Sequence, residues 1–288
     1  MKVLIFGGCG FIGSYLVDEL TKRKYTVTIV DKENRTQKKS FIECDILDTN
    51  KLEKIDIEEF DFVYNMAGLA DIDIASENPL DTIKLNILGN LNILNICKNR
   101  KIRRFVFASS TYALSNKGSF YGISKLSSEK LIEEYFRKYG LKYTIIRYGS
   151  VYGEKKFFNN YIYNLIEEII KTNKIVHHGD GEEIREYIHA ADAAKLSVDI
   201  IENSKYENGH VILTGFEKMR RIDLFKMIIE ILNKDVKIEL KNKGYINHYK
   251  RTPYSFLPEV SEKLIANPFI DIGQGILNCI KSVYGSLE

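Results

Sequence analysis

The feature that most constrains the fold is a set of glycines after the first apolar run. Lys2 to Phe6 has the composition of a buried strand, and Gly7, Gly10 and Gly13 follow it where an amphipathic stretch begins. A strand that turns directly into a helix uses such glycines for a tight turn, for close approach of a ligand and for close helix–strand packing. The N-terminus of that helix offers free backbone N–H groups to an anion.

Short β-branched runs alternate with longer amphipathic stretches through the first half of the chain. Apolar strands separated by helices predict a parallel sheet covered on both faces, which is a Rossmann-type doubly wound α/β fold. The predicted strands are Lys2–Phe6, Thr26–Val30, Ser40–Glu43, Phe62–Asn65, Arg104–Ser109 and Tyr143–Tyr148. The predicted helices among them are Ile12–Arg23, Leu80–Asn99 and Tyr121–Tyr139.

From Val151 onward the pattern is less regular, as expected of a smaller, mixed α/β domain at the carboxyl edge of the sheet. Helices are predicted at Tyr161–Lys171, Ala190–Glu202 and Arg221–Asn233, and a strand at His210–Thr214. We expect residues 1–150 to form a dinucleotide-binding domain. Residues 151–288 would form mainly the substrate-binding domain, with part of 185–215 returning to the first sheet.

Composition excludes several classes of function. With 42 basic and 39 acidic residues, the net charge of +3 predicts no binding to nucleic acid or to a membrane surface. The first apolar run is too short for a signal peptide or a membrane span. The four cysteines have no metal or disulfide spacing, and neighbours such as His177 and His178 would point to opposite faces of a strand. We therefore expect no metal site and a cytoplasmic location.

Asp31 closes the second predicted strand, eighteen residues after Gly13. A carboxylate at this place binds the adenosine ribose hydroxyls of a dinucleotide and repels a 2′-phosphate. NAD is therefore favoured over NADP. Lys32 and Arg35 follow closely, so the alternative cofactor stays open.

The segment Tyr121-Gly-Ile-Ser-Lys125, on a predicted helix after the fifth strand and downstream of the glycine motif, resembles the extended short-chain dehydrogenase/reductase family. The resemblance covers nearly the whole chain. Arg147-Tyr-Gly-Ser-Val-Tyr-Gly153 and Gly179-Asp-Gly-Glu-Glu-Ile-Arg-Glu-Tyr-Ile-His189 resemble segments typical of the sugar-nucleotide epimerases and dehydratases in that family.

The resemblance implies a set of residues that bind NAD. Asp45 and Ile46 match the pair that contacts adenine, Met66 to Gly68 match the loop beneath the cofactor, and Asn86 matches a helix asparagine. The full predicted set is Gly7, Gly10, Phe11, Ile12, Gly13, Asp31, Asp45, Ile46, Met66, Ala67, Gly68, Asn86, Ser109, Tyr121, Lys125 and Gly149.

Residues four apart share one helix face, so the ammonium of Lys125 can lie beneath the phenol of Tyr121. Together with the positive nicotinamide ring it would lower the pKa of Tyr121, which could then take a proton from a sugar hydroxyl. By resemblance, the hydrogen on the adjoining carbon leaves as hydride, Ser110 hydrogen-bonds the reacting oxygen, and Lys125 also binds the nicotinamide ribose. Ser109 and Thr111 are the alternatives to Ser110.

The implied substrate is a nucleotide-linked sugar. Arg185 is predicted to bind its diphosphate, because a guanidinium contacts phosphate oxygens in a bidentate way. Asn159 and Asn160 stand where the family often has an amide for the nucleotide, although they could simply begin the next helix. The predicted substrate residues are Ser110, Tyr121, Ser150, Asn159, Asn160 and Arg185.

Two departures from the family pattern bear on the reaction. Only eleven positions separate Ser110 from Tyr121, so one wall of the sugar pocket is reduced and 115–118 is expected to form a tight turn. Thr111 and Tyr112 occupy the places where sugar 4,6-dehydratases usually have an Asp-Glu pair, which disfavours dehydration.

The favoured function is an NAD-dependent nucleoside-diphosphate-sugar 4-epimerase that acts through a transient 4-keto sugar. A net 4-dehydrogenase or 4-keto reductase would use the same three residues, and a non-catalytic dinucleotide-sensing regulator is the alternative from another class. The resemblance also implies a homodimer, in which the long helices Leu80–Asn99 and Tyr121–Tyr139 could pair into a four-helix bundle. The aromatic segment 244–256 could cover the sugar or pack on the small domain.

Overall fold

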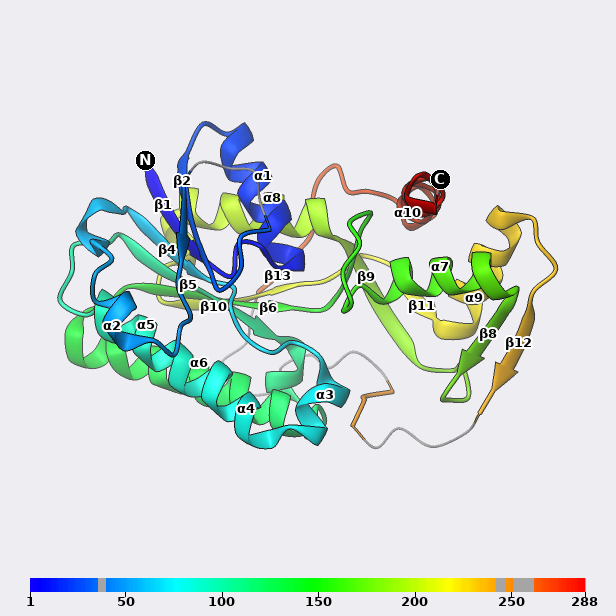
Figure 1. Ribbon diagram of the computed structural model, residues 1–288, viewed down its shortest axis with the longest axis horizontal. Helices are drawn as coiled ribbons and strands as arrows, with labels where there is room; N and C mark the ends of the chain where they lie inside the picture. Colours follow the sequence, from blue (N-terminus) through cyan, green and yellow to red (C-terminus); the bar gives the residue numbers. More distant parts are fainter. Residues whose placement is uncertain (36–39, 242–246, 251–261, 288) are drawn as a thin grey trace.

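The computed structural model describes residues 1–35, 40–241, 247–250 and 262–287. Its central element is an eight-stranded sheet in the order β13-β10-β6-β5-β4-β1-β2-β3, in which all neighbouring strands are parallel (Figure 1). The strands are β1 (Lys2–Phe6), β2 (Thr26–Asp31), β3 (Phe41–Glu43), β4 (Phe62–Asn65), β5 (Arg104–Ser110), β6 (Tyr143–Tyr148), β10 (Gly209–Leu213) and β13 (Glu262–Leu264). The predicted Rossmann-type fold is confirmed, whereas β13 is a strand that the sequence analysis did not predict.

Helices cover both faces of this sheet, as its buried apolar strands require. On one face α1 (Phe11–Lys22) packs beside α8 (Ala190–Glu202), and on the other lie α5 (Gly89–Cys97) and α6 (Ser119–Tyr139). Figure 1 shows the two helical layers above and below the strands. Each helical layer packs an apolar cluster against its face of the sheet, so the core has two parts, one on each side of the strands.

The predicted helix Leu80–Asn99 is not a regular α-helix over its whole length. α4 (Pro79–Ile83) leads into a π-helical turn, η2 (Lys84–Leu88), which continues into α5. Such turns are frequent at functional sites. This one contains Asn86, whose side chain reaches the loop after β4.

Shorter elements lie in the connections between the strands. They are α2 (Thr49–Leu52), η1 (Ile57–Glu59), α3 (Ile72–Glu77), η3 (Thr111–Leu114) and η4 (Ser204–Tyr206). The segment from Ser115 to Gly118, predicted as a tight turn, leads directly into α6, with Gly118 at φ +92° as the N-cap residue.

A smaller lobe lies beyond the carboxyl ends of the strands, to the right in Figure 1. Its sheets pair β11 (Lys218–Arg220), β9 (Ile184–His189) and β7 (Ser150–Tyr152), and separately β12 (Lys237–Leu240) with β8 (Lys174–His177). Its helices α7 (Tyr161–Thr172), α9 (Arg221–Leu232) and α10 (Ile272–Leu287) enclose a third apolar cluster. Within 185–215, β10 joins the large sheet and α8 covers it, whereas β9 belongs to the small lobe.

The four cysteines are buried, and none of them is in a disulfide. No helix in the described ranges is both long and apolar enough to cross a membrane. Among the residues that the structure describes, no group of three or more His, Cys, Asp or Glu side chains is placed to hold a metal ion.

Glu154 joins the two lobes where the chain leaves β7. Its carboxylate accepts a hydrogen bond from Tyr15 of α1 at 2.8 Å and lies 3.0 Å from Nε2 of His189, at the end of β9. Burial alone would raise the pKa of Glu154, but the interactions with His189 and Tyr15 outweigh it and lower that pKa to about 2. The ionised carboxylate therefore holds α1 against the small lobe.

Glu154→Gln should lower the free energy of unfolding by about 1–2 kcal/mol at pH 7, because Tyr15 and His189 lose a charged acceptor. A carboxyl with a depressed pKa stabilises the fold above its ordinary value of 4.5 and loses that contribution as the pH falls toward 2. In urea denaturation the difference between wild type and variant should therefore shrink below pH 4.5. Glu53→Gln, at an exposed position, is the control; a difference that stays constant with pH would contradict the explanation.

Candidate active site

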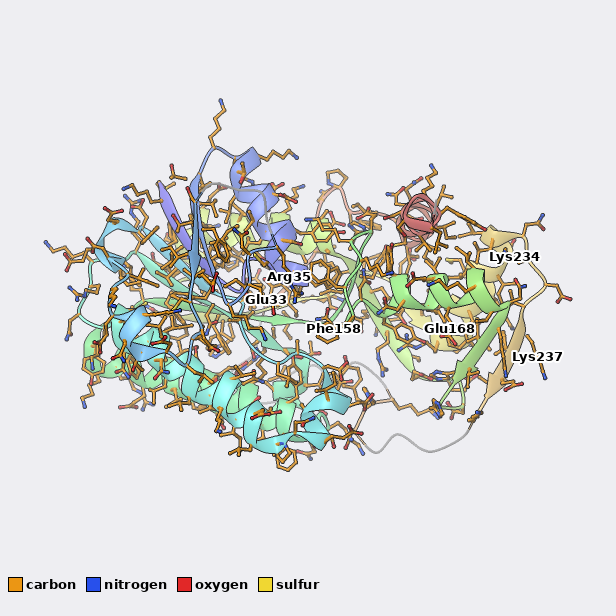
Figure 2. The ribbon with its side chains drawn as sticks, in the orientation of Figure 1. Glu33, Arg35, Phe158, Glu168, Lys234 and Lys237 are labelled. Carbon is orange, nitrogen blue, oxygen red and sulfur yellow. The ribbon has the colours of Figure 1, made fainter. Side chains whose placement is uncertain are left out.

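A cleft runs between the carboxyl edge of the large sheet and the small lobe. Figure 2 shows two of its lining residues near the centre of the molecule: Arg35, from the loop after β2, and Phe158, from the segment after β7. Many of the predicted site residues line the same cleft: Gly7, Gly10, Phe11, Ile12, Gly13, Met66, Gly68, Ser109, Ser110, Tyr121, Lys125, Gly149, Ser150, Asn159 and Arg185.

The glycine loop leaves no space for side chains. Gly7 has φ +77°, and a Cβ there would lie 2.5 Å from the backbone nitrogen of Ala67. A Cβ on Gly13 would lie 2.2 Å from the carbonyl oxygen of Gly7. Helix α1 therefore starts close against β1, and its N-cap Gly10 has no side chain to occupy the free N–H groups. This cradle fits the pyrophosphate of a dinucleotide.

Asp31 lies at the end of β2 beside this loop. Its carboxylate accepts hydrogen bonds from the backbone N–H of Cys9 at 3.0 Å and of Lys32 at 2.9 Å. Arg35 is one of the two cations that could have bound the 2′-phosphate of NADP. Its Nε donates a hydrogen bond to the carboxylate of Glu33 at 2.9 Å. The neighbouring carboxylate thus offsets the charge of that guanidinium, which favours the cofactor without a 2′-phosphate.

Asn86 lies beneath the cleft rather than on its surface. Its Oδ1 accepts a hydrogen bond from the N–H of Leu69 at 2.7 Å, and its Nδ2 donates to the Leu69 carbonyl at 3.0 Å and to Ser124 Oγ at 2.9 Å. The contact of Asn86 with the cofactor stays a prediction. The amide is used within the protein, where it ties the loop after β4 to α6.

Four other predicted cofactor residues are not among those that line the cleft: Asp31, Asp45, Ile46 and Ala67. The Asp45 carboxylate accepts the N–H of Leu47 at 2.8 Å, and Ile46 packs so closely under α5 that a Cβ on Gly89 would lie 2.4 Å from its side chain. These contacts fix the loop after β3. The adenine contacts of Asp45 and Ile46 stay predictions.

Ser110, Tyr121 and Lys125 meet where β5 ends against α6. Lys125 Nζ donates to the carbonyl of Ala108 at 2.8 Å and lies 5.9 Å from the centre of the Tyr121 ring. Ser110 Oγ accepts the N–H of Tyr112 at 3.2 Å and is hydrogen-bonded to the phenol of Tyr121. The fold thus brings together the three residues that the sequence analysis assigned to catalysis.

Burial dominates the acid–base properties of this group. It raises the pKa of Tyr121 to about 12, although the hydrogen bond with Ser110 opposes the rise. It lowers the pKa of Lys125 to about 8, while the negative charge of Glu129 acts in the opposite direction. The protein residues alone therefore do not lower the pKa of Tyr121 as predicted, because desolvation disfavours the phenolate. The prediction also relied on the positive nicotinamide ring.

A buried ion pair that the sequence patterns did not predict supports α6. Glu129 is fully buried and binds Arg147 of β6 through both carboxylate oxygens, at 2.9 and 2.6 Å. It also accepts a hydrogen bond from the hydroxyl of Ser109, whose contact with the cofactor stays a prediction. Tyr121, Lys125 and Glu129 are spaced by four residues, so the shared helix face was a signal that could have revealed the pair.

Residues 247–250 pack along the cleft beside α6. The Tyr249 ring lies 4.3 Å from that of Tyr112 and 4.4 Å from the guanidinium of Arg185. Tyr112 Oη lies 3.1 Å from Nδ1 of His248. This part of the aromatic segment therefore lines the candidate site, where the short loop after β5 leaves room for it. Residues 244–246 and 251–256 lie outside the described ranges.

Of the predicted substrate residues on the small-lobe side, Arg185 and Asn159 line the cleft. Asn160 is fully buried, and its Nδ2 donates to the carbonyls of Gly153 at 2.6 Å and Lys155 at 2.9 Å. Its amide thus holds the turn before α7, and the contact of Asn160 with the substrate stays a prediction. Asn159 lines the cleft, and its contact with the substrate stays a prediction.

Comparison with known proteins identifies the family. A sequence model described as the NAD dependent epimerase/dehydratase family matches residues 3–215. A putative UDP-glucose 4-epimerase of Methanocaldococcus jannaschii is 33% identical over 219 residues, which span 68% of this chain and 72% of that protein. The chain belongs to the NAD-dependent epimerase/dehydratase family. It is an NAD-dependent enzyme of the extended short-chain dehydrogenase/reductase type, as predicted.

Solved structures with the same fold cover the chain from end to end. UDP-glucose 4-epimerase of Thermotoga maritima, solved with UDP-glucose, has a TM-score of 0.83 at 25% identity and covers 100% of both chains. UDP-glucuronic acid 4-epimerase of Bacillus cereus, solved with UDP-glucuronic acid and NAD, has a TM-score of 0.85 at 22% identity and covers 99% of this chain and 100% of its own. The two-lobed fold is thus shared with enzymes of this family.

Gly13→Ala should weaken NAD binding more than about tenfold in calorimetry, because the added methyl group would lie 2.2 Å from a backbone oxygen and force α1 away from β1. Gly209→Ala is the matched control, since its added methyl group would meet nothing closer than 3.8 Å. Wild-type affinity in Gly13→Ala would show that this loop does not hold the cofactor.

Proposed function

We propose that this family member is a nucleoside-diphosphate-sugar 4-epimerase, which inverts carbon 4 of the sugar through a transient 4-keto sugar. The observation that carries the proposal is the convergence of Ser110, Tyr121 and Lys125 at the end of β5, next to Thr111 and Tyr112. The three residues can move one proton to and from a sugar hydroxyl. Neither Thr111 nor Tyr112 supplies the carboxyl that elimination of water would use.

Tyr121 is the base in this proposal. It takes the proton of the 4-hydroxyl group and returns it when the ketone is reduced, while Ser110, bonded to the same phenol, positions the reacting oxygen. When bound, NAD supplies the acceptor for the hydrogen of carbon 4 and a positive ring that opposes the effect of burial on the phenol. Lys125, anchored on the carbonyl of Ala108, adds its ammonium on the same helix face.

The remaining residues of the cleft bind rather than react. Gly149 and Ser150 follow β6 and line the cleft. A Cβ on Gly149 would lie 2.6 Å from Thr214 Oγ1, so a side chain does not fit at this position. Arg185 would bind the substrate diphosphate. Asn159, whose Oδ1 is buried without a hydrogen-bond partner in the described part of the chain, would contact the nucleotide.

We also infer a homodimer formed through α4, η2 and α6. Leu80 is 63% exposed and Ile123 is 61% exposed, and Ile83, Leu88 and Leu126 are exposed as well. α4 packs beside α6 along the lower edge of the molecule in Figure 1. Exposed apolar side chains gathered on two adjacent helices indicate an interaction site. Two copies would bury them in a four-helix bundle.

The purified protein should release NAD on denaturation, as detected by mass spectrometry. Without added cofactor it should convert at least one member of a panel of UDP-, GDP-, CDP- and dTDP-sugars into a product of the same mass and different retention. Turnover that requires added NAD(H) and changes the mass would instead indicate a net 4-dehydrogenase or 4-keto reductase.

In the same assay, Tyr121→Phe should lower turnover at least about 100-fold while NAD stays bound, because it removes the general base. Tyr139→Phe, on the last turn of the same helix, should behave like wild type. Unchanged turnover in Tyr121→Phe would overturn the proposed role and leave a regulator as the better description.

Ile123→Lys should convert the dimer into a monomer, because it would place charges at the centre of the helical interface. Light scattering should show the mass fall from twice 33.3 kDa to 33.3 kDa. Leu240→Lys, at an exposed apolar position on β12, should leave the mass unchanged. A wild-type protein that is already monomeric at micromolar concentration would refute the dimer.

A further inference from the structure

The segment that follows β7 reaches from the small lobe to the start of α1. The backbone N–H of Lys155 donates a hydrogen bond to Tyr15 Oη at 3.0 Å. Its Nζ donates to Asp18 Oδ2 at 2.7 Å and to Ser14 Oγ at 3.2 Å. The same ammonium lies 4.3 Å from the centre of the Tyr15 ring, within the range of a cation–π interaction. Lys155 therefore contacts α1 at three residues.

Hydrogen bonds from the beginning of α7 fix the backbone of the same segment. Asn160 Nδ2 donates to the carbonyl of Lys155 at 2.9 Å. Asn164 Nδ2 donates to the carbonyls of Phe157 at 3.1 Å and of Phe158 at 2.8 Å. Residues 155–158 are thus held by α7 on one side and by α1 on the other. We call these four residues the bridge segment.

Both phenylalanines of the bridge segment lie along the cofactor cleft. The Phe157 ring lies 5.6 Å from that of Phe11, the first residue of α1. Phe158 is 69% exposed, and it lines the cleft together with Gly10 and Arg35 (Figure 2). An exposed aromatic ring beside a dinucleotide cradle gains burial when a ligand occupies that cradle.

Phe158 and Arg35 also line a second hollow, on the other side of the glycine loop, together with Cys9, Asp18 and Lys155. The two side chains therefore border both spaces, and the contact between Lys155 and Asp18 lies in the second one. A dinucleotide that leaves the cradle on this side has to pass the bridge segment.

We propose that the bridge segment is a clamp that retains NAD in the cleft, and that Lys155 is the positioning residue that holds it against α1. Phe158 covers the bound dinucleotide, and the contacts of Lys155 with α1 break before the segment lifts. Segments that close over a ligand commonly control its release. Contacts of this kind act mainly on the rate of dissociation.

The consequence of the clamp for catalysis rests on the proposed function. A 4-epimerase returns the hydride to the sugar that supplied it, so the cofactor has to stay bound through the whole cycle. A net dehydrogenase or reductase has to exchange its cofactor after each turnover, and a clamp would slow that exchange. Slow release of NAD therefore suits the epimerase.

The test is the exchange of bound NAD for deuterated NAD, without any sugar. Protein saturated with NAD is freed of excess cofactor, mixed with excess deuterated NAD and sampled over time by gel filtration and mass spectrometry of the bound cofactor. Lys155→Met should exchange at least about fivefold faster than wild type, because a partly exposed ion pair, a hydrogen bond and a cation–π contact are lost together. Wild-type exchange in Lys155→Met would overturn the inference.

Lys156→Met is the matched control for this measurement. Lys156 is the next residue, its side chain is 59% exposed, and it pairs with Glu167 of α7 at 2.7 Å rather than with α1. This variant should exchange NAD at the wild-type rate. Asp18→Ala should accelerate exchange in wild type but add little in Lys155→Met, because the contact is already absent there.

Phe158→Ala covers the case in which Lys155→Met does not fold, because Phe158 is exposed. It should accelerate NAD exchange several-fold, whereas Phe216→Ala, at a position that is 61% exposed and outside the cleft, should not; an unchanged rate in Phe158→Ala would overturn the inference. Exchange does not depend on turnover. A clamp that needs Lys155 in a protein that epimerises no sugar would sink only the proposed function, and an active epimerase whose NAD exchange is indifferent to Lys155 would sink only this inference.

Discussion

The close approach of Gly13 to the carbonyl of Gly7 sets the position of α1, and much of the molecule follows from that position. Because no side chain separates helix from strand, α1 can lie flat on the sheet beside α8 and bring Tyr15 within reach of Glu154. The same approach leaves the N–H groups at the start of α1 directed at the cleft. One short distance therefore determines the packing of the first layer, a connection to the small lobe and the shape of the cofactor cradle.

Desolvation has a comparable influence on the chemistry. The face of α6 that carries Tyr121 and Lys125 is buried, so neither side chain has the proton affinity it would have in water. Glu129, held by Arg147, places a fixed negative charge one turn further along the same face. The protein thus prepares a tyrosine that holds its proton tightly and a lysine that holds its proton less tightly. The charge of a bound cofactor would then act on an environment of low dielectric, where it has a large effect.

Sequence patterns were most informative where burial and local geometry alone decide the structure. β1, β4 and β6 have the predicted bounds, because continuous apolar runs between helices can only be central strands. β13 has three residues and pairs with a distant strand, so its sequence contains no periodic signal. The side chain of Asn86, in the π-helical turn, bonds a distant loop, and that of Asn160 bonds the irregular turn before α7; neither arrangement has a periodic sequence signal. Arg221, the first residue of α9, lines the cleft without any sequence signal, because only the tertiary structure brings α9 there.

The chain passes several times between the two lobes, and this path affects how the protein unfolds. After β7 the chain enters the small lobe, returns to the large sheet for α8 and β10, leaves for β11, α9 and β12, and returns again for β13 before α10. A fragment ending near residue 215, where the family match ends, would lack the edge strand beside β10 and half of the buried residues of the third apolar cluster. Neither lobe is a continuous stretch of chain. The two lobes should therefore unfold as one cooperative unit rather than as separable modules.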